Sequence, residues 1–122
     1  MSNQVPLSEA AGNQPVTLIN AFTVALHESD RFLRRWKDNA RIMASQPGFI
    51  RAPMYKSLVE DAELRFINVA EWSSGETLAK ARTNPGFLAS VRRLMDDPEL
   101  HVTPRPAIYQ VAVEVRPGDT FE

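Results

Sequence analysis

The segment from Leu64 to Trp72 constrains the fold more than any other part of the sequence. Successive side chains of a β-strand point to opposite faces, so Phe66, Asn68, Ala70 and Trp72 share one face of a strand here. A buried carboxamide without a partner costs about 1–3 kcal/mol. Asn68 therefore needs a partner, which is either a neighbouring protein group or a ligand.

A second predicted strand places an asparagine in the same kind of row. Residues 16–24 are rich in β-branched side chains, which is typical of a strand. One face of this strand carries Asn20 two residues before Phe22. Buried polar groups are usually satisfied within the protein, so Asn20 and Asn68 can pair with each other or with the backbone. The alternative is that both amides face a ligand.

A period of 3.6 residues over residues 29–45 predicts an amphipathic helix. We expect Ser29 or Asp30 to cap this helix, and Pro47-Gly48 to end it. The arginines on its polar face would also suit RNA, but the aromatic strand signature of RNA-binding ferredoxin-like domains is absent. A solvated helix face is therefore the better interpretation.

Cap motifs predict two further helical segments. Ser73, followed by Glu76, forms a capping box that starts a short helix. Asn84-Pro85 starts the next one, with the asparagine as cap and the proline in the first turn. That helix carries an apolar stripe and ends before Asp97-Pro98.

Two more strands are predicted at residues 49–58 and 107–115, with Pro53 at a bulge or an edge position. The order β-α-β-β-α-β indicates a ferredoxin-like α+β fold. Ile67 and Val69 make the central strand apolar on its second face as well. Because helices cover only one face of such a sheet, we expect a homodimer with the sheets packed back to back.

Length and composition limit the number of domains and the kinds of partner. With 122 residues the chain suits one domain, which we place at residues 15–116, between a flexible arm at 1–14 and a tail at 117–122. The net charge of −1 does not indicate nucleic acid or an anionic membrane as a partner. There is no cysteine, no signal-peptide pattern and no apolar run of about 20 residues. We therefore expect a cytoplasmic protein without metal ligation by thiolates.

Four stretches of the sequence resemble the antibiotic biosynthesis monooxygenase family, whose members are small dimeric α+β barrel proteins. The resemblance extends over residues 16–115. The Pro-Gly-Phe step after the first helix is common in that superfamily and marks the fold. The matching stretches are residues 16–24, Gln46-Pro47-Gly48-Phe49-Ile50, Ile67-Asn68-Val69-Ala70-Glu71-Trp72 and Asn84-Pro85-Gly86-Phe87-Leu88.

The combination of Asn20, Asn68 and Trp72 is similar to the cofactor-independent branch of the family, which oxidises polyketide anthrones to quinones with O₂ in antibiotic biosynthesis. The resemblance implies that these three residues are catalytic, that the substrate is an aromatic polyketide, and that neither a cofactor nor a metal is needed. The residues expected to bind the substrate are Phe22, Phe32, Trp36, Met54, Phe66, Phe87, Val91 and Met95.

The sequence also departs from its relatives. Haem-degrading members carry an axial histidine at the position of Val91, which argues against haem. One quinone-forming relative has Tyr and His at the positions of Met54 and Tyr55, and Tyr at that of Leu78, so a mechanism that uses those groups does not transfer. The alternatives are a non-catalytic dimer of the same fold that binds small aromatic molecules and, less favoured, a haem-degrading monooxygenase.

Overall fold

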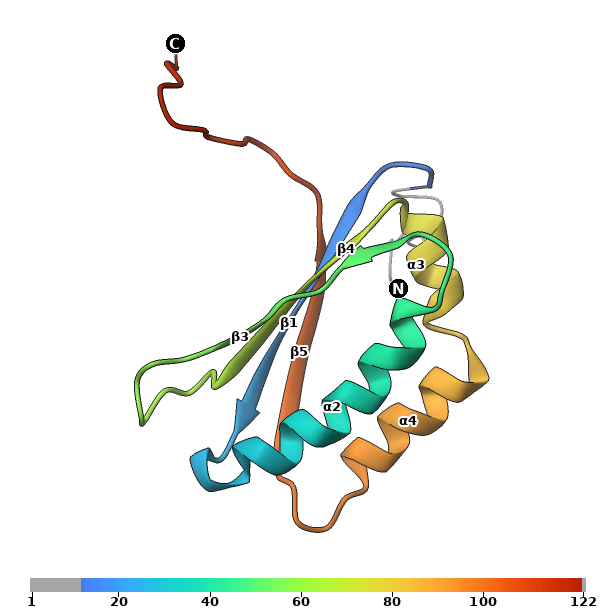
Figure 1. Ribbon diagram of the computed structural model, residues 1–122, viewed down its shortest axis with the longest axis vertical. Coiled ribbons are helices and arrows are strands. Elements are labelled where there is room, and N and C mark those ends of the chain that lie inside the picture. Colours follow the sequence, from blue (N-terminus) through green and yellow to red (C-terminus); the bar gives the residue numbers. More distant parts are fainter. Residues whose placement is uncertain (1–11, 122) are drawn as a thin grey trace, which may run out of the picture.

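The computed structural model describes residues 12–121 and contains one antiparallel sheet. The central strands are β4 (Phe66–Trp72) and β1 (Val16–Val24), and β5 (Val102–Tyr109) lies at the edge beside β1. Two short strands, β2 (Phe49–Arg51) and β3 (Met54–Lys56), both pair with β4. The sheet is open within the single chain, and the helices lie on one of its faces (Figure 1).

The register of β1 and β4 confirms the two central strands. Val16 pairs with Trp72, Asn20 with Asn68, and Phe22 with Phe66. The burial of β4 alternates strictly, with Phe66, Asn68, Ala70 and Trp72 all buried under the helices. The two asparagines therefore lie opposite each other on the covered face.

Four helical segments complete the fold. The 3₁₀ turn η1 (Leu26–Glu28) leads into α2 (Ser29–Ala44), and α3 (Gly75–Ala81) precedes α4 (Pro85–Met95). Helices α2 and α4 run beside each other across the sheet (Figure 1). This arrangement confirms the ferredoxin-like α+β fold. None of the helices within residues 12–121 has the length and apolar character that crossing a membrane requires.

The core consists of two apolar clusters. The Trp72 cluster contains Val16, Met43, Ala70, Trp72, Leu78 and Ala81. The Phe32 cluster contains Phe22, Val24, Phe32, Phe66, Leu94 and Leu100. Each cluster joins the sheet to the helices, so both are needed to hold the helices at a fixed height above the central strands.

The predicted cap of the first helix is wrong. Ser29 and Asp30 both lie inside α2, and Glu28 is the N-cap without a side-chain cap bond. The Ser29 hydroxyl instead donates to the Leu26 carbonyl oxygen at 2.7 Å. The preceding 3₁₀ turn already orders the chain there, so the helix starts without a side-chain cap.

Of the two predicted caps of the later helices, one is correct and the other is displaced by one residue. Ser74, not Ser73, caps α3, because its hydroxyl oxygen accepts the Thr77 N–H at 3.1 Å. Asn84 caps α4 as predicted, accepting the Phe87 N–H at 3.1 Å. With two adjacent serines, the sequence alone did not decide which backbone adopts the extended cap conformation.

The strand predicted at residues 49–58 is split into β2 and β3, with Pro53 in the gap. The register shifts between Phe49 and Arg51, and the Pro53 carbonyl oxygen accepts the Val69 N–H at 3.0 Å. The hairpin with β4 and the irregularity near Pro53 are thus confirmed.

The last strand was misplaced. It was predicted at residues 107–115, but β5 begins at Val102 and ends at Tyr109. Pro104 and Pro106 lie within it, opposite Phe22 and Asn20. Prolines argued against a strand, yet β5 is an edge strand, where a missing N–H is tolerated. The chain beyond Tyr109 leaves the body of the molecule (Figure 1).

The ends of the predicted domain are only partly described. Residues 1–11 of the expected arm lie outside the described residues, as does Glu122. Within the described part, the carbonyl oxygens of Gly12 and Gln14 accept the backbone N–H groups of Glu76 and Gly75 at 2.9 and 3.1 Å. Residues 12–14 therefore lie against the start of α3.

Gly48 makes the turn from α2 into β2 with a φ of +87°. A Cβ atom at this position would clash with the Thr77 side chain on α3. Its carbonyl oxygen also accepts the Ser73 N–H at 2.7 Å. The glycine of the Pro-Gly-Phe step is thus required both by its backbone conformation and by the close approach of α3.

We expect Gly48→Ala to lower the free energy of unfolding by about 1–3 kcal/mol, because a left-handed backbone and a steric clash both oppose it. The control is Gly118→Ala, where φ is +85° but no atom lies within 4 Å of the added Cβ. Urea denaturation compares the two variants. Equal stability losses at the two positions would contradict the role of the α3 contact.

Asp97 ties α2 to the turn after α4. Its side chain is fully buried and accepts hydrogen bonds from Arg31 Nε at 2.8 Å and Arg35 Nε at 3.0 Å. The hydrogen bond from Arg31 is the main reason that the pKa of Asp97 lies well below its usual range, and the Glu99 backbone N–H contributes as well. This carboxylate is therefore ionised whenever the protein is folded at neutral pH.

A carboxylate with a depressed folded-state pKa stabilises the fold above its unfolded-state pKa of about 3.9, and that stabilisation is lost as the pH falls below it. We expect native protein to lose urea stability on acidification from pH 7 to pH 3, and Asp97→Asn to be less stable at pH 7 but to lose less on acidification. Exposed Asp96→Asn is the control, with a native-like pH profile.

Candidate active site

A cavity of about 370 Å³ lies between the covered face of the sheet and the helices. Its walls come from strands β1, β2, β4 and β5 and from helices α2 and α4, with one residue between β2 and β3 and one following α3. Residues of both core clusters line it, so its shape is set by the packing of the core. The lining residues are Leu18, Asn20, Phe22, Trp36, Asn39, Ala40, Met43, Ala44, Phe49, Ala52, Asn68, Ala70, Trp72, Arg82, Phe87, Val91, Leu94, Met95, Pro104 and Pro106.

Asn20 and Asn68 both line this cavity from adjacent strands. Directly opposed side chains in an antiparallel pair have Cβ atoms about 4.5–5.5 Å apart, so the two carboxamides are neighbours. Asn20 Oδ1 accepts the backbone N–H of Arg105 on β5 at 3.1 Å. That bond fixes the orientation of the amide and leaves its NH₂ group free of protein partners among the described residues.

The carboxamide of Asn68 has fewer hydrogen-bond partners than that of Asn20. Its side chain is 9% exposed, and its buried Oδ1 has no hydrogen-bond partner among the described residues. The two asparagines thus do not pair with each other, and the backbone occupies only one of their oxygens. An amide that lacks partners in a largely apolar cavity is ready to bind a polar group of a ligand.

Trp72 presents a second group of this kind. It is 1% exposed, and its indole Nε1 is buried without a partner among the described residues. Phe49 holds the indole edge-on, with ring centroids 5.4 Å apart and an interplanar angle of 81°. The ring is therefore fixed as part of the cavity wall, with an unused N–H donor.

Five of the eight residues expected to bind substrate line the cavity: Phe22, Trp36, Phe87, Val91 and Met95. The other three do not. Phe32 is fully buried between Phe22 and Phe66, with ring centroids at 4.9 and 5.1 Å. Met54 packs against the same cluster. Phe32, Phe66 and Met54 therefore support the wall from behind.

Asn39 is a lining residue that sequence reasoning missed. It lies on α2 three residues after Trp36, on the same helix face, and is 9% exposed. The Ser90 hydroxyl of α4 donates to its Oδ1. This bond joins the two helices over the sheet and brings a third carboxamide to the cavity. Asn39 lies next to Ala40 on the apolar face of α2 that also carries Trp36 and Met43. That position was the signal in the sequence from which Asn39 could have been predicted to face the cavity.

Arg82, Pro104 and Pro106 were also missed. Arg82 follows α3 as its C-cap residue, and nothing in the local sequence pattern distinguishes it from other exposed arginines. The two prolines belong to the part of β5 that was predicted as loop. They close the cavity beside Asn20, whose Cα partner on β5 is Pro106.

The lining offers hydrogen bonds and apolar contact but no general base. Among the described lining residues Arg82 is the one ionisable side chain, and arginine stays protonated in proteins. No group of three His, Cys, Asp or Glu side chains within residues 12–121 is placed to hold a metal ion. The arrangement can bind a flat aromatic molecule and stabilise negative charge on its oxygen atoms.

Comparison with known proteins identifies relatives. Over 73 residues the chain is 32% identical to the deoxynogalonate monooxygenase of Streptomyces nogalater, a match that covers 60% of this chain and 59% of that protein. The crystal structure of SnoaB, a cofactor-independent oxygenase from the same organism, is similar with a TM-score of 0.69 and 28% identity, covering 85% of this chain and 98% of SnoaB. A Shewanella loihica PV-4 protein is similar with a TM-score of 0.65 and 31% identity, covering 83% and 97%.

The curated relative is matched over less than two thirds of its length, whereas the solved structures are matched over nearly all of theirs. Residues 15–93, which include β1, α2, β4 and all but the last two residues of α4, match the antibiotic biosynthesis monooxygenase family. The chain therefore belongs to the antibiotic biosynthesis monooxygenase family.

Proposed function

We propose that this protein is a cofactor-independent monooxygenase that oxidises a polycyclic aromatic anthrone or related phenol to a quinone with O₂, in antibiotic biosynthesis. The observation that carries the proposal is the pair of opposed carboxamides, Asn20 and Asn68, with unused hydrogen-bonding groups in a largely apolar cavity. The likeness to SnoaB, a cofactor-independent oxygenase, supports the same chemistry. We place the reaction in the cytoplasm, in keeping with the cysteine-free sequence.

The reaction needs no external reductant. Ground-state O₂ is a triplet, so most enzymes activate it with a metal or an organic cofactor. A deprotonated anthrone can instead transfer one electron to O₂, and the resulting radical pair combines to form a carbon–oxygen bond. The peroxide takes up a proton and loses water. The CH₂ carbon thus becomes C=O, with one oxygen atom in the quinone and the other in water.

The carboxamides act on the first of these steps. The NH₂ groups of Asn20 and Asn68 donate hydrogen bonds to the enolate oxygen, and so favour the anion that reacts with O₂. One such donor in a water-excluded site contributes on the order of 2.7–4 kcal/mol to lowering the barrier. Neighbouring donors are rarely additive, so the two together contribute less than the sum.

Trp72 has a different role in this proposal. Its ring forms a flat wall against which a fused-ring substrate packs, and its Nε1–H, buried without a partner among the described residues, becomes a donor to the peroxide oxygen. Because Phe49 packs edge-on against the indole, the N–H keeps its direction when the cavity is empty. The wall and the donor are therefore in place before the substrate binds.

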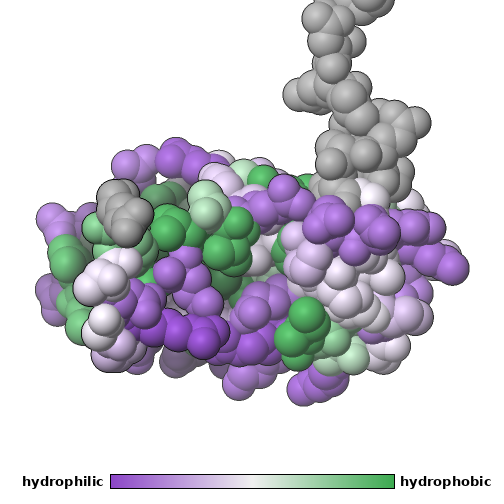
Figure 2. Space-filling model, turned by 90° about the horizontal axis from the view of Figure 1, so that it is seen from above, coloured by the Kyte–Doolittle hydropathy of each residue, from purple (hydrophilic) through white to green (hydrophobic). Residues whose placement is uncertain are grey.

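We also propose a homodimer. The sheet face opposite the helices carries Ile19, Ile67 and Val69, all partly exposed in the single chain. Apolar residues alternate in the sequence from the end of β5 into the tail, and all four are exposed; we call Tyr109, Val111, Val113 and Val115 the apolar row. The view from above, from the end at which the C-terminal tail leaves the body, shows hydrophobic patches between hydrophilic side chains (Figure 2). A second copy that covers the sheet face and the tail would remove both surfaces from water.

We expect native protein, freed of metals and flavin, to accelerate O₂ uptake and quinone formation from dithranol. Asn68→Ala and Asn20→Ala are each expected to lower kcat by roughly 10²–10³-fold, since each removes one donor to the anion. Exposed Asn13→Ala is the control and keeps native kcat. The measurements are oxygen-electrode rates and quinone absorbance.

Three outcomes would contradict this proposal. Rates equal to those in buffer, with dithranol bound, would indicate a binding protein without turnover. Dependence on added iron or flavin would indicate another route to O₂ activation. A Soret shift with hemin, followed by loss of the haem spectrum, would indicate haem degradation.

Analytical ultracentrifugation at micromolar concentration is expected to give twice the 13.7 kDa of one chain. The double variant Val111→Asp and Val113→Asp puts two charges on the apolar row and is expected to shift the protein to monomer. Exposed Glu114→Gln, the residue after Val113, is the control that stays dimeric. A native monomer, or a dimer that the double variant leaves intact, would contradict the proposed interface.

A further inference from the structure

Arg82 is the charged residue of the described cavity lining, and no side chain within residues 12–121 pairs with its charge. It lines the cavity but forms no ion pair and no side-chain hydrogen bond among the described residues. Most other arginines of the chain are paired. The arginines with a carboxylate partner within 4.0 Å are Arg31, Arg35, Arg41, Arg51, Arg105 and Arg116. Arg82 is exposed as well as lining the cavity, so its guanidinium, without such a partner, is available to an anion.

The ends of two helices lie near Arg82, so its positive charge determines whether this part of the cavity attracts or repels an anion. Ala44, the last residue of α2, and Arg82, the C-cap of α3, both line the cavity. The C-terminal end of a helix carries partial negative charge from its free carbonyl groups. Without Arg82 this end of the cavity would repel an anion, whereas its planar guanidinium can hold a carboxylate with two parallel hydrogen bonds.

Arg82 lies toward one end of the cavity, whereas the carboxamide pair lies nearer its middle, since Phe22 and Pro104 line it further along. Ala81 packs with Trp72 in the Trp72 cluster, which places the neighbouring Arg82 at the Trp72 end. Asn68 precedes Trp72 by four residues on β4, a separation of about 13 Å at 3.3 Å per residue. This spacing is comparable with the long dimension of linearly fused aromatic rings. One molecule can therefore reach the carboxamides with a ring oxygen and Arg82 with a substituent.

We propose that Arg82 is a specificity-determining residue that binds a carboxylate on the substrate, at the end of the ring system remote from the carboxamides. This inference rests on the proposed function, and it narrows the substrate class to polycyclic phenols that carry an acidic substituent. Arg82 itself takes no part in the oxygen chemistry. It selects and orients a carboxylated ring system over a neutral one.

The test uses two anthraquinones that differ by one carboxyl group: 1,8-dihydroxyanthraquinone-3-carboxylic acid and 1,8-dihydroxyanthraquinone. Quenching of the fluorescence of Trp36 and Trp72, which line the cavity, gives the Kd of each. Native protein is expected to bind the carboxylic acid roughly 10-fold or more tightly at neutral pH, the size of a charge-assisted hydrogen bond. Arg82→Gln is expected to lose most of this preference, and Arg82→Lys to keep part of it.

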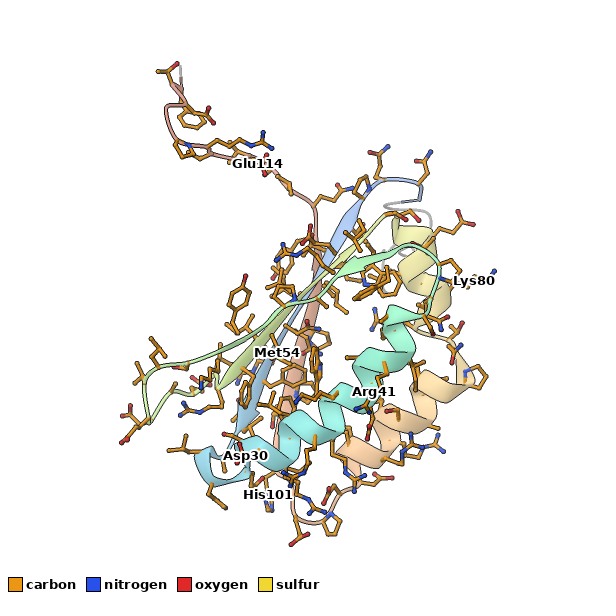
Figure 3. The ribbon with its side chains drawn as sticks, in the orientation of Figure 1. Asp30, Arg41, Met54, Lys80, His101 and Glu114 are labelled. Atoms are coloured by element: carbon orange, nitrogen blue, oxygen red, sulfur yellow. The ribbon has the colours of Figure 1, made fainter. Side chains whose placement is uncertain are left out.

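Lys80→Gln is the matched control, because it removes the same charge two residues earlier. Lys80 lies on the outer side of α3 and points away from the molecule, and it does not line the cavity (Figure 3). The preference of this variant should equal that of native protein. Circular dichroism checks that all variants are folded.

Equal affinity of native protein for both quinones would overturn the proposal. It would also be overturned if Lys80→Gln lost as much preference as Arg82→Gln, since the effect would then be one of net charge. Binding of these quinones involves no turnover, so the result is independent of whether dithranol is oxidised. Failure of the oxygenase assay with a normal carboxylate preference would refute the proposed function alone, and the reverse result would refute the role of Arg82 alone.

Discussion

The pairing of β1 with β4 is the constraint on which the rest of this molecule depends. A slip of one residue in a strand pair turns every side chain to the opposite face. Val16 packed with Trp72 at one end, and Phe22 with Phe66 at the other, make such a slip costly because all four side chains are buried. The register that these apolar pairs enforce is what sets Asn20 opposite Asn68 beneath the helices. The geometry of the site is thus a consequence of core packing several residues away.

The same arrangement has a cost in stability. The buried Asn68 Oδ1 and Trp72 Nε1 lack partners among the described residues, and groups of this kind are normally satisfied. Nearby polar groups are satisfied within the fold: Asn39 is bonded to Ser90, and the Asn20 oxygen to the Arg105 N–H. Unsatisfied groups that line a cavity, next to satisfied ones, are characteristic of sites where binding takes precedence over stability.

The sequence was informative where a single periodicity decides the structure. Alternation placed Asn20 and Asn68 on the apolar faces of two strands, and the caps and stripes located the helices. The sequence was less informative about which buried side chains are enclosed by the core and which line the cavity. Phe32 and Trp36 belong to one helical stripe, yet Phe32 is enclosed by Phe22 and Phe66 while Trp36 faces the cavity. Periodicity identifies the buried side of a helix, but which of its residues meet a neighbour and which meet a void depends on the opposing layer.

Two further failures have particular causes. The start of β5 was missed because Pro104 and Pro106 disfavour a strand, and only the three-dimensional position at the sheet edge makes them acceptable. Arg82 was missed because an exposed arginine after a short helix is ordinary, and its significance lies in the cavity that it lines and in the absence of a carboxylate partner among the described residues. Neither property is local in sequence.

The chemistry of the lining also limits which substrates can react under the proposed mechanism. Because the described lining holds no carboxylate, histidine or lysine, the proposed mechanism forms the anion by the acidity of the substrate itself, assisted by hydrogen bonds to its oxygen. A donor that contributes about 2.7–4 kcal/mol lowers the pKa of the bound substrate by about 2–3 units, at 1.36 kcal/mol per unit. Two non-additive donors reach further, but not far enough to ionise a simple ketone at neutral pH. The cavity is therefore suited to ring systems in which the carbonyl is conjugated to phenolic rings that already stabilise the anion.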